Sequence, residues 1–343
     1  MTSPVVIAVD GGGSKTDVAL VRGDGEALAL VRGPSSHAHH VGVAGSLDVI
    51  ERLLDDAIAD ARLERRDGAF AAVGAFTLAG ADSAADYDAL TAAAEARGWS
   101  ARTIVLNDTF AILRAGTARG WGVAVTCGSG INCVGVAPDG RHARFPSLGK
   151  ISGDWGGGYD LGMAAVYTAA RSEDGRGPKT SLEQSVPAHF GLKTPTELAE
   201  AIHDGRIAQR RAIELAPLVL AEGEHDAVAA SIVQRLADEV VALARVALIR
   251  LDLTDQPVEV LLGGGVLQDV DGDLLAAIKT GLAEIGPQIV VRPTAAPAIV
   301  GTALLGLDEL GADDETQQRL RQELGTAFAG LDGVPELGRS TVG

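Results

Sequence analysis

The sequence predicts an α/β protein built from two similar halves that face each other across a cleft. A strand, a small-residue loop, a second strand and an Asp-Gly turn occur at 6–25 and again at 122–140. Alternating helix and strand patterns follow each copy, and 343 residues suffice for two domains. Repeats of this size reveal architecture, and ligands usually bind where two such halves meet.

The first loop lies in "VVIAVDGGGSKTDVALV", residues 5–21. A Walker loop is excluded because Val9 stands where its first glycine is required. A dinucleotide fingerprint is excluded because Thr16 replaces the third glycine and a strand follows instead of a helix. We therefore expect a strand–loop–strand turn after Asp10, with free backbone N–H groups and Lys15 facing an anion. An ordinary glycine-rich hairpin is the alternative.

The second loop, in "GVAVTCGSGINCVGVAPDG", aligns with the first at an offset of 116 residues. One residue is slipped at the Asp-Gly turn. The aligned pairs are Thr126 with Asp10, Gly128 with Gly12, and Asn132 with Thr16.

The remaining elements follow the same order in both halves. After the first loop we expect a hairpin turning at Gly23–Gly25, a helix at 46–63, a strand at 71–80, a helix near 84–97 and a strand at 102–108. The second half ends with a strand at 257–266, a helix near 271–284, a strand at 288–293 and a helix near 297–310.

A mostly helical segment at about 161–251, punctuated by prolines, is expected to be an insertion in the second half. We expect it to pack near a nucleotide base or to form the surface of a homodimer. The predicted domains are 1–115 and 116–310, followed by a charged, partly flexible tail at 311–343. The last dozen residues of the tail are excluded from function.

Composition restricts the class of partner. With 29 Lys and Arg against 46 Asp and Glu, the net charge is −17, so nucleic acids and anionic membranes are disfavoured partners. No apolar run reaches the roughly 18 residues of a membrane span. The N-terminus carries no basic stretch before its first strand, which predicts a cytoplasmic protein.

The chain has two cysteines, Cys127 and Cys133, which flank the second loop. A disulfide is disfavoured because the protein is expected to be cytoplasmic. A metal site is disfavoured because two thiols cannot complete a set of four ligands. We expect buried, reduced thiols.

The ordered motifs Asp-Gly-Gly-Gly-Ser-Lys-Thr, Asn-Asp, Cys-Gly-Ser-Gly-x-Asn-Cys, Gly-Gly-Gly-Val and "PAIVGTALLGL" resemble the BadF/BadG-type ATPase family. The resemblance covers roughly residues 5 to 310. It implies duplicated ribonuclease-H-like, that is actin-like ATPase, domains around a cleft, as in the actin/hexokinase/Hsp70 superfamily. The family includes N-acetylglucosamine kinase.

The resemblance also implies roles for single residues. Asp108, at a strand-to-helix corner, matches the catalytic base that takes the sugar hydroxyl proton; the alternative is that Asp108 or Asn107 only caps the helix. Asp10 is expected to organise Mg²⁺, directly or through water. The implied nucleotide-binding residues are Gly11, Gly12, Gly13, Ser14, Lys15, Thr16, Thr126, Gly128, Ser129, Gly263, Gly264 and Gly265.

The implied sugar-binding residues are Ser36, Asn107, Asp108, Asn132 and Asp154. Two positions depart from related kinases: Leu148 replaces a frequent tryptophan, and Trp155 follows Asp154 where a glutamate is common. The histidines at 37, 39 and 40 lack a carboxylate partner in the sequence. A polar loop is favoured over a metal site, and hydrogen bonding to a substrate is the alternative.

Together these features predict an ATP- and Mg²⁺-dependent amino-sugar kinase acting on the 6-hydroxyl of N-acetylglucosamine or a close relative. Asn132 suits a neutral acetamide, whereas Asp154 suits the ammonium group of glucosamine. The alternatives are a glucosamine or other small-molecule kinase, an ATPase that activates a radical dehydratase through an iron–sulfur cluster, and a non-catalytic sugar sensor.

Overall fold

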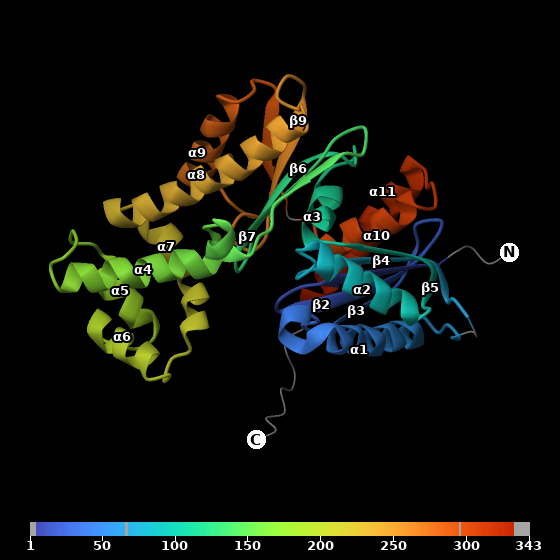
Figure 1. Ribbon diagram of the computed structural model, residues 1–343, viewed down its shortest axis with the longest axis horizontal. Coiled ribbons are helices and arrows are strands. Elements are labelled where there is room, and N and C mark those ends of the chain that lie inside the picture. The colour runs from blue at the N-terminus through green and yellow to red at the C-terminus, as the bar shows by residue number, and fades with distance from the viewer. Residues whose placement is uncertain (1–4, 66–67, 295, 333–343) are drawn as a thin grey trace. The chain divides into compact units, whose positions relative to one another are not determined.

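The computed structural model describes residues 5–65, 68–294 and 296–332. The chain forms two compact units. Unit 1 contains residues 1–118 and 296–343, and unit 2 contains residues 119–295. Each unit is built on a five-stranded sheet with helices packed against it (Figure 1).

The sheet of unit 1 has the strand order β3-β2-β1-β4-β5. Its first three strands form an antiparallel meander, and β4 and β5 continue the sheet parallel to β1. The predicted turn at Gly23–Gly25 joins β2 to β3. The strands are β1 (Val5–Gly11), β2 (Lys15–Arg22), β3 (Ala27–Pro34), β4 (Ala71–Leu78) and β5 (Ser100–Leu106).

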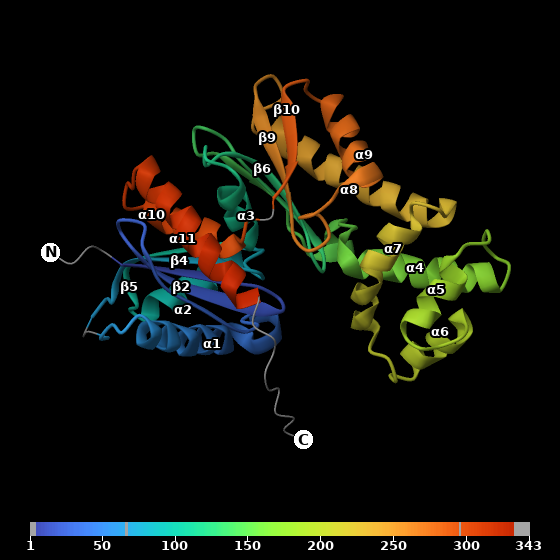
Figure 2. The same cartoon turned by 180° about the vertical axis from the view of Figure 1, so that it is seen from behind.

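Helices cover both faces of this sheet (Figures 1 and 2). Because side chains alternate along a strand, Ile7 and Val9 of β1 pack with α1 and α2, whereas Val6 and Ala8 pack with α10 and α11. A further helix, α3, packs against α10. The helices are α1 (Ala38–Asp60), α2 (Ala84–Ala96), α3 (Asp108–Gly116), α10 (Ala298–Asp308) and α11 (Asp314–Asp332).

The sheet of unit 2 has the order β10-β9-β6-β7-β8. Read from the other edge it repeats the order and the strand directions of unit 1, with β6 in the place of β1, so the predicted duplication is confirmed. The strands are β6 (Gly122–Cys127), β7 (Ile131–Val136), β8 (His142–Arg144), β9 (Val258–Gly263) and β10 (Ile289–Pro293).

The strand register corrects one detail of the predicted alignment. In unit 1, Gly11 pairs with Thr16 across the loop, whereas Cys127 pairs with Ile131 in unit 2, so the second loop is one residue shorter. The slip therefore lies in the glycine loop and not at the Asp-Gly turn. As a result, Asn132 is the structural counterpart of Asp17, and not of Thr16 as predicted.

The helical segment of unit 2 is close to the predicted one, with one correction. Its last helix, α8, packs on β7 and β8, the counterparts of β2 and β3 on which α1 packs, and also on β6, so α8 belongs to the repeated fold. The insertion proper is α4–α7. The helices are α4 (Gly157–Glu173), α5 (Leu182–His189), α6 (Pro195–His203), α7 (Ala216–Glu222), α8 (Ala227–Arg250) and α9 (Gly272–Ala283), with two 3₁₀ helices at Gly149–Ser152 and Gln209–Leu215.

The predicted boundary at residue 310 differs from the observed division. Helix α10 follows the last strand of unit 2 in the sequence but packs on the sheet of unit 1, because Val300, Leu304 and Leu307 are buried there. The charged segment after it forms α11, whose Leu320 and Leu324 are also buried. Residues 333–343, nearly all of the segment excluded from function, lie outside the described residues.

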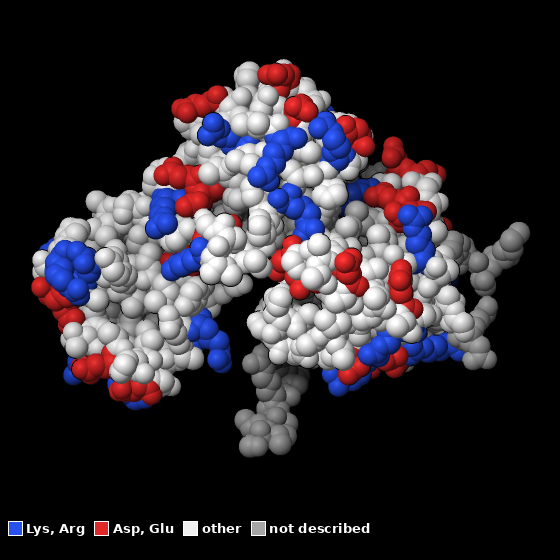
Figure 3. All heavy atoms as spheres, in the orientation of Figure 1, with Lys and Arg blue, Asp and Glu red and all other residues white. Residues whose placement is uncertain are grey.

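Acidic and basic side chains are interspersed over the face drawn in Figure 3. Within the described ranges, none of the helices combines the length and the apolar character needed to cross a membrane.

Candidate active site

The carboxyl edge of the unit 1 sheet gathers the polar residues predicted for catalysis. Strands β1, β4 and β5 run parallel, and Asp10 pairs with Thr77, which in turn pairs with Leu106. Asn107 and Asp108 follow directly after this row. The parallel strands therefore bring Asp10 and Asp108 to the same edge, although 98 positions separate them in the sequence.

Asn107, and not Asp108, caps helix α3. The Asn107 side-chain oxygen accepts hydrogen bonds from the backbone N–H of Thr109 at 3.1 Å and from its hydroxyl at 2.6 Å. The Asn107 amide nitrogen donates to Asp82 at 3.0 Å. Asn107 therefore fulfils the capping role, and the role of Asp108 as the base stays a prediction.

Burial raises the pKa of Asp108 to about 6, and the nearby charge of Asp82 adds to this rise. Hydrogen bonds from the backbone N–H groups of Thr109 and of Asp108 itself act in the opposite direction. The carboxylate is thus mostly ionised at pH 7 but close enough to neutrality to accept a proton readily, as a general base requires.

Burial also raises the pKa of Asp10, to about 8, and the charges of Asp108 and Asp17 raise it further. Lys15 and a hydrogen bond from Thr77 lower it. Burial and the two neighbouring carboxyl groups thus disfavour the ionised form of Asp10, and a divalent cation with a preference for oxygen ligands, such as Mg²⁺, would favour that form. In the part of the chain that is described, no three His, Cys, Asp or Glu side chains form a complete metal site.

The first glycine loop is only partly open to an anion. The N–H of Gly12 donates to the carbonyl of Lys15 at 2.9 Å, so this group is used within the turn and is not free as expected. Gly13, Ser14 and Lys15 are exposed. Gly11 is required for space, because a Cβ there would lie 2.6 Å from the Ser36 Oγ atom.

Thr16 and Ser36, both predicted to contact a ligand, hydrogen-bond to each other in this structure. Both are buried, and the Thr16 hydroxyl donates to the Ser36 hydroxyl at 2.9 Å. The neighbouring Ser35 hydroxyl donates to the Gly12 carbonyl at 2.9 Å. In this structure the segment after β3 therefore fixes the conformation of the loop, and ligand contacts by Thr16 and Ser36 stay a prediction.

In unit 2, Thr126 and Asn132 face each other at the end of the β6–β7 hairpin. The Thr126 hydroxyl is buried and has no hydrogen-bond partner among the described residues. Such a group usually has a partner, and a phosphate oxygen would supply one. The Asn132 side-chain oxygen accepts hydrogen bonds from the Ser147 hydroxyl at 2.5 Å and the Cys133 N–H at 2.7 Å.

Two further glycine clusters hold the second loop, 128–130. In the first, Gly264 has φ 81°, and a Cβ there would lie 2.6 Å from the Cys127 carbonyl oxygen. In the second, at the start of α4, the N–H of Gly158 donates to the Gly128 carbonyl at 2.8 Å, and a Cβ on Gly157 would lie 2.4 Å from the Gly130 Cα.

The sequence motifs predict a nucleotide contact for 263–265, but they do not identify the role of 156–158 in shaping the loop. Three consecutive glycines before an amphipathic helix were the available signal.

The residues that depart from related kinases have different surroundings. Trp155 is buried in the core of unit 2, with the Arg235 guanidinium 4.0 Å from its ring centroid, so it is a packing residue. Leu148 is 46% exposed. Between them, Asp154 accepts a hydrogen bond from the Ser152 hydroxyl at 2.5 Å.

The histidine cluster lies at the start of α1 and not in a loop. His37 is its N-cap and accepts a hydrogen bond from the His39 N–H at 3.3 Å. The rings of His37 and His40 stack with centroids 4.4 Å apart.

Cys127 and Cys133 are free and buried, as predicted. Burial raises the pKa of the Cys127 thiol to about 12, and the pKa of Cys133 shifts in the same direction for the same reason.

Comparison with known proteins supports this architecture. A model of the BadF/BadG/BcrA/BcrD ATPase family matches residues 7–306. An N-acetylmuramic acid/N-acetylglucosamine kinase from Clostridium acetobutylicum is 29% identical over 270 residues, covering 78% of this chain and 86% of that protein. An N-acetyl-D-glucosamine kinase from Dictyostelium discoideum is 27% identical, covering 65% of this chain and 72% of that protein.

Among solved structures, one assigned as an N-acetylglucosamine kinase from Chromobacterium violaceum is 26% identical and superposes with a TM-score of 0.67, covering 88% of this chain and 99% of that one. A ROK hexokinase from Thermus thermophilus shares the fold at 18% identity, with a TM-score of 0.51 and coverage of 90% and 100%. The predicted α/β fold with duplicated actin-like ATPase domains is confirmed.

Proposed function

The chain belongs to the BadF/BadG/BcrA/BcrD ATPase family, and from this premise we propose that it is an ATP-dependent amino-sugar kinase. It transfers the γ-phosphoryl group of ATP to the 6-hydroxyl of N-acetylglucosamine or a close relative. Its curated relatives are named as kinases of N-acetylated amino sugars.

The observation that carries the proposal is the state of Asp108. Its carboxylate lies at the same sheet edge as Asp10, Asn107 is the N-cap of α3, and burial raises the pKa of Asp108 to about 6. In the proposed reaction the sugar 6-oxygen attacks the γ-phosphorus, the bond to the β-phosphate oxygen breaks, and Asp108 accepts the hydroxyl proton. ADP and the sugar 6-phosphate leave.

Family membership implies ATP use, and Mg²⁺ is our proposal for the accompanying cation. Asp10 is the residue that would hold it, directly or through water. Bound Mg²⁺ would offset charge on the β- and γ-phosphates during transfer. The exposed Gly13, Ser14 and Lys15 of the first loop and the unpartnered Thr126 hydroxyl of the second are each proposed to contact phosphate oxygens.

For the sugar we propose the N-acetylated form. An acetamide requires neutral hydrogen-bonding groups, and Asn132 offers an amide, whereas an ammonium group requires a carboxylate such as Asp154. A homodimer formed through α4–α7 is also proposed, and sedimentation velocity of the purified protein tests it.

The decisive experiment measures ADP release with N-acetylglucosamine, N-acetylmuramic acid, glucosamine and glucose at saturating ATP and Mg²⁺. Phosphorus and carbon NMR of the product identify the phosphorylated oxygen. We expect the highest kcat/KM with an N-acetylated sugar. A tenfold preference for glucosamine, about 1.4 kcal/mol of transition-state discrimination, would replace the sugar assignment. ADP release without transfer to any sugar would refute the kinase.

A further inference from the structure

Helix α11 lies beyond the part of the chain that matches the family, which ends at residue 306. It nevertheless packs on the same face of the unit 1 sheet as α10, and its Leu320 and Leu324 side chains are fully buried there. The helix packs on β3, and its Phe328 ring lies near Lys15, where β2 leaves the first glycine loop.

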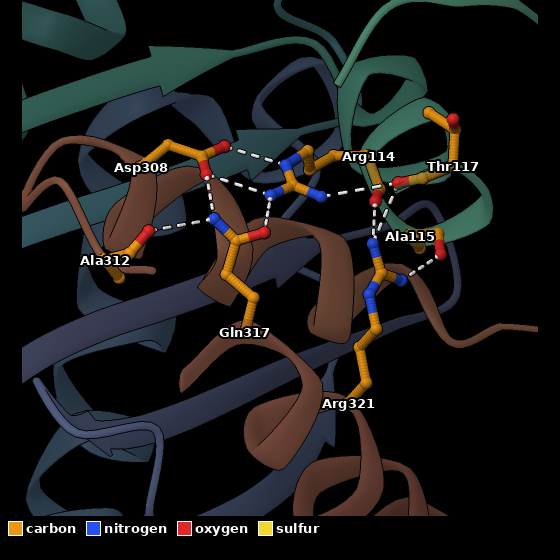
Figure 4. Close-up of polar contacts among 7 residues, drawn as sticks. All are labelled: Arg114, Ala115, Thr117, Asp308, Ala312, Gln317 and Arg321. Carbon is orange, nitrogen blue, oxygen red and sulfur yellow. Dashed lines mark hydrogen bonds and ion pairs between the residues drawn. The ribbon is translucent and has the colours of Figure 1, made fainter. Parts of the chain in front are cut away.

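Polar contacts fix the position of α11 along its length. The Arg321 guanidinium donates to the carbonyls of Arg114 at 3.0 Å, Thr117 at 2.8 Å and Ala115, so it satisfies the end of α3 (Figure 4). Gln317 joins the bidentate ion pair that links Arg114 to Asp308, accepting from Arg114 at 2.6 Å (Figure 4).

Further along the helix, Glu323 accepts from the backbone N–H of Ala27 in β3 at 2.9 Å. The anchored helix places its last turn beside the β2–β3 pair.

A row of polar side chains crosses the sheet face covered by α10 and α11. Thr77 pairs with Asp10, Asp10 with Asp17, and Asp17 with Arg32, on four adjacent strands. Cross-strand partners point to the same face. The Phe328 ring of α11 stands at the end of this row, with its centroid 4.6 Å from the Arg32 guanidinium carbon and 5.4 Å from the Lys15 ammonium nitrogen.

The link between Arg32 and Asp17 is bidentate. The Arg32 Nε atom donates to Asp17 Oδ1 at 2.7 Å and Nη2 donates to Oδ2 at 3.1 Å, and the Asp17 side chain is only 2% exposed. Loss of the partner of a buried carboxylate is strongly destabilising, because it leaves a buried charge without compensation. The ring face of Phe328 attracts the guanidinium and limits the conformations of this long side chain.

We propose that Phe328 is a positioning residue for nucleotide binding, because it holds Arg32 against Asp17 and thereby fixes β2 and the first glycine loop, beside which Lys15 would contact the phosphates and Asp10 would hold Mg²⁺. The proposal rests on the nucleotide role of the first loop. It makes α11, which lies beyond the residues matched by the family model, a supporting element of the first loop.

The test compares Phe328→Leu with Phe328→Tyr, which keeps the ring, and with Leu320→Ala, which removes α11 packing away from Arg32 and Lys15. Calorimetric titration with ADP and Mg²⁺ gives the nucleotide Kd, and thermal unfolding without nucleotide gives the Tm. We expect Phe328→Leu to weaken nucleotide binding about three- to tenfold, in line with the strength of such contacts. Phe328→Tyr should stay within twofold of the parent, and Leu320→Ala should lower the Tm with an unchanged Kd.

A cycle with Arg32→Gln tests whether Phe328 acts through Arg32. The Kd of the double variant should then equal that of Arg32→Gln alone, because coupled residues are not additive. An unchanged Kd in Phe328→Leu, the same loss in Leu320→Ala, or full additivity in the cycle would each overturn the proposal. Since binding of ADP is measured without sugar, a failure of the kinase assignment would be seen separately.

Discussion

Replacement of Asp108 by Asn should abolish most activity and at the same time stabilise the fold. The substitution keeps the shape of the side chain and removes both its charge and its ability to accept the proton. Loss of a general base costs roughly 10²–10⁴ in kcat. The gain in stability follows from the pKa of Asp108, which burial raises to about 6 in the folded protein from an ordinary value of 3.8.

The sign of the stability change follows from linkage. The folded-state pKa of Asp108 is raised above the unfolded value near 3.8, so the folded protein holds the proton more tightly than the unfolded chain. The resulting contribution to the free energy of unfolding is fully present below pH 3.8 and is lost as the pH rises through about 6. The difference in pKa corresponds to about 3 kcal/mol at pH 8, which is an upper value. For a unit of this size it raises the Tm by several degrees, up to roughly 10 °C. Below pH 4 the parent and Asp108→Asn should melt together.

The assay is a series of melting curves from pH 4 to pH 8, with kcat and kcat/KM measured in parallel. In the parent, kcat/KM should fall as the pH drops below about 6, because the base becomes protonated. Asp86→Asn is a control of opposite sign. Burial raises the pKa of Asp86, but hydrogen bonds from Ser83 outweigh it and lower the pKa, so this variant should be less stable than the parent at pH 8. Near-normal turnover in Asp108→Asn, or a lower Tm at pH 8, would refute the reasoning.

Three further outcomes follow from contacts within single units. In urea unfolding, Arg321→Gln should lose about 1–3 kcal/mol of stability, because carbonyls at the end of α3 are left without a donor. Its control, Arg319→Gln, removes exposed ion pairs and should lose less than about 1 kcal/mol. Equal losses in the two variants would contradict this. Gly301→Ala should destabilise by more than about 3 kcal/mol, because its Cβ would lie 1.9 Å from the Ala111 carbonyl oxygen of α3; a normal Tm would disprove this close approach. Cys127 and Cys133 should not react with a thiol reagent at pH 8 until the protein is unfolded, and the purified protein should contain no iron. Rapid labelling of the thiols, or bound iron and sulfide, would favour the dehydratase activator.

The sequence alone was sufficient for the duplicated α/β fold, because both signals behind it are local. Glycine loops between apolar strands and the period of 3.6 along each helix are properties of short segments. The predicted helix at 84–97 and the strand at 257–266 correspond closely to α2 and β9 for this reason. The buried state of Cys127 and Cys133 followed equally from composition and context.

Features that depend on contacts between distant parts of the chain differ from the prediction. The placement of α10 and α11 on the unit 1 sheet depends on which apolar surface they meet, and a periodic pattern does not identify that surface. The one-residue difference between the two loops became visible only in the pairing of Thr126 with Asn132.

For the candidate site, the ordered motifs are the basis on which Asp10, Asp108 and the loops are predicted. Only the tertiary structure decided that Asn107 is the cap, that Thr16 and Ser36 bond to each other, and that Asp17, Arg32 and Phe328 form the support behind the first loop. The physical reason is that hydrogen bonds and the pKa of a carboxyl group depend on the three-dimensional neighbourhood, whereas motifs record only residue type and spacing along the chain.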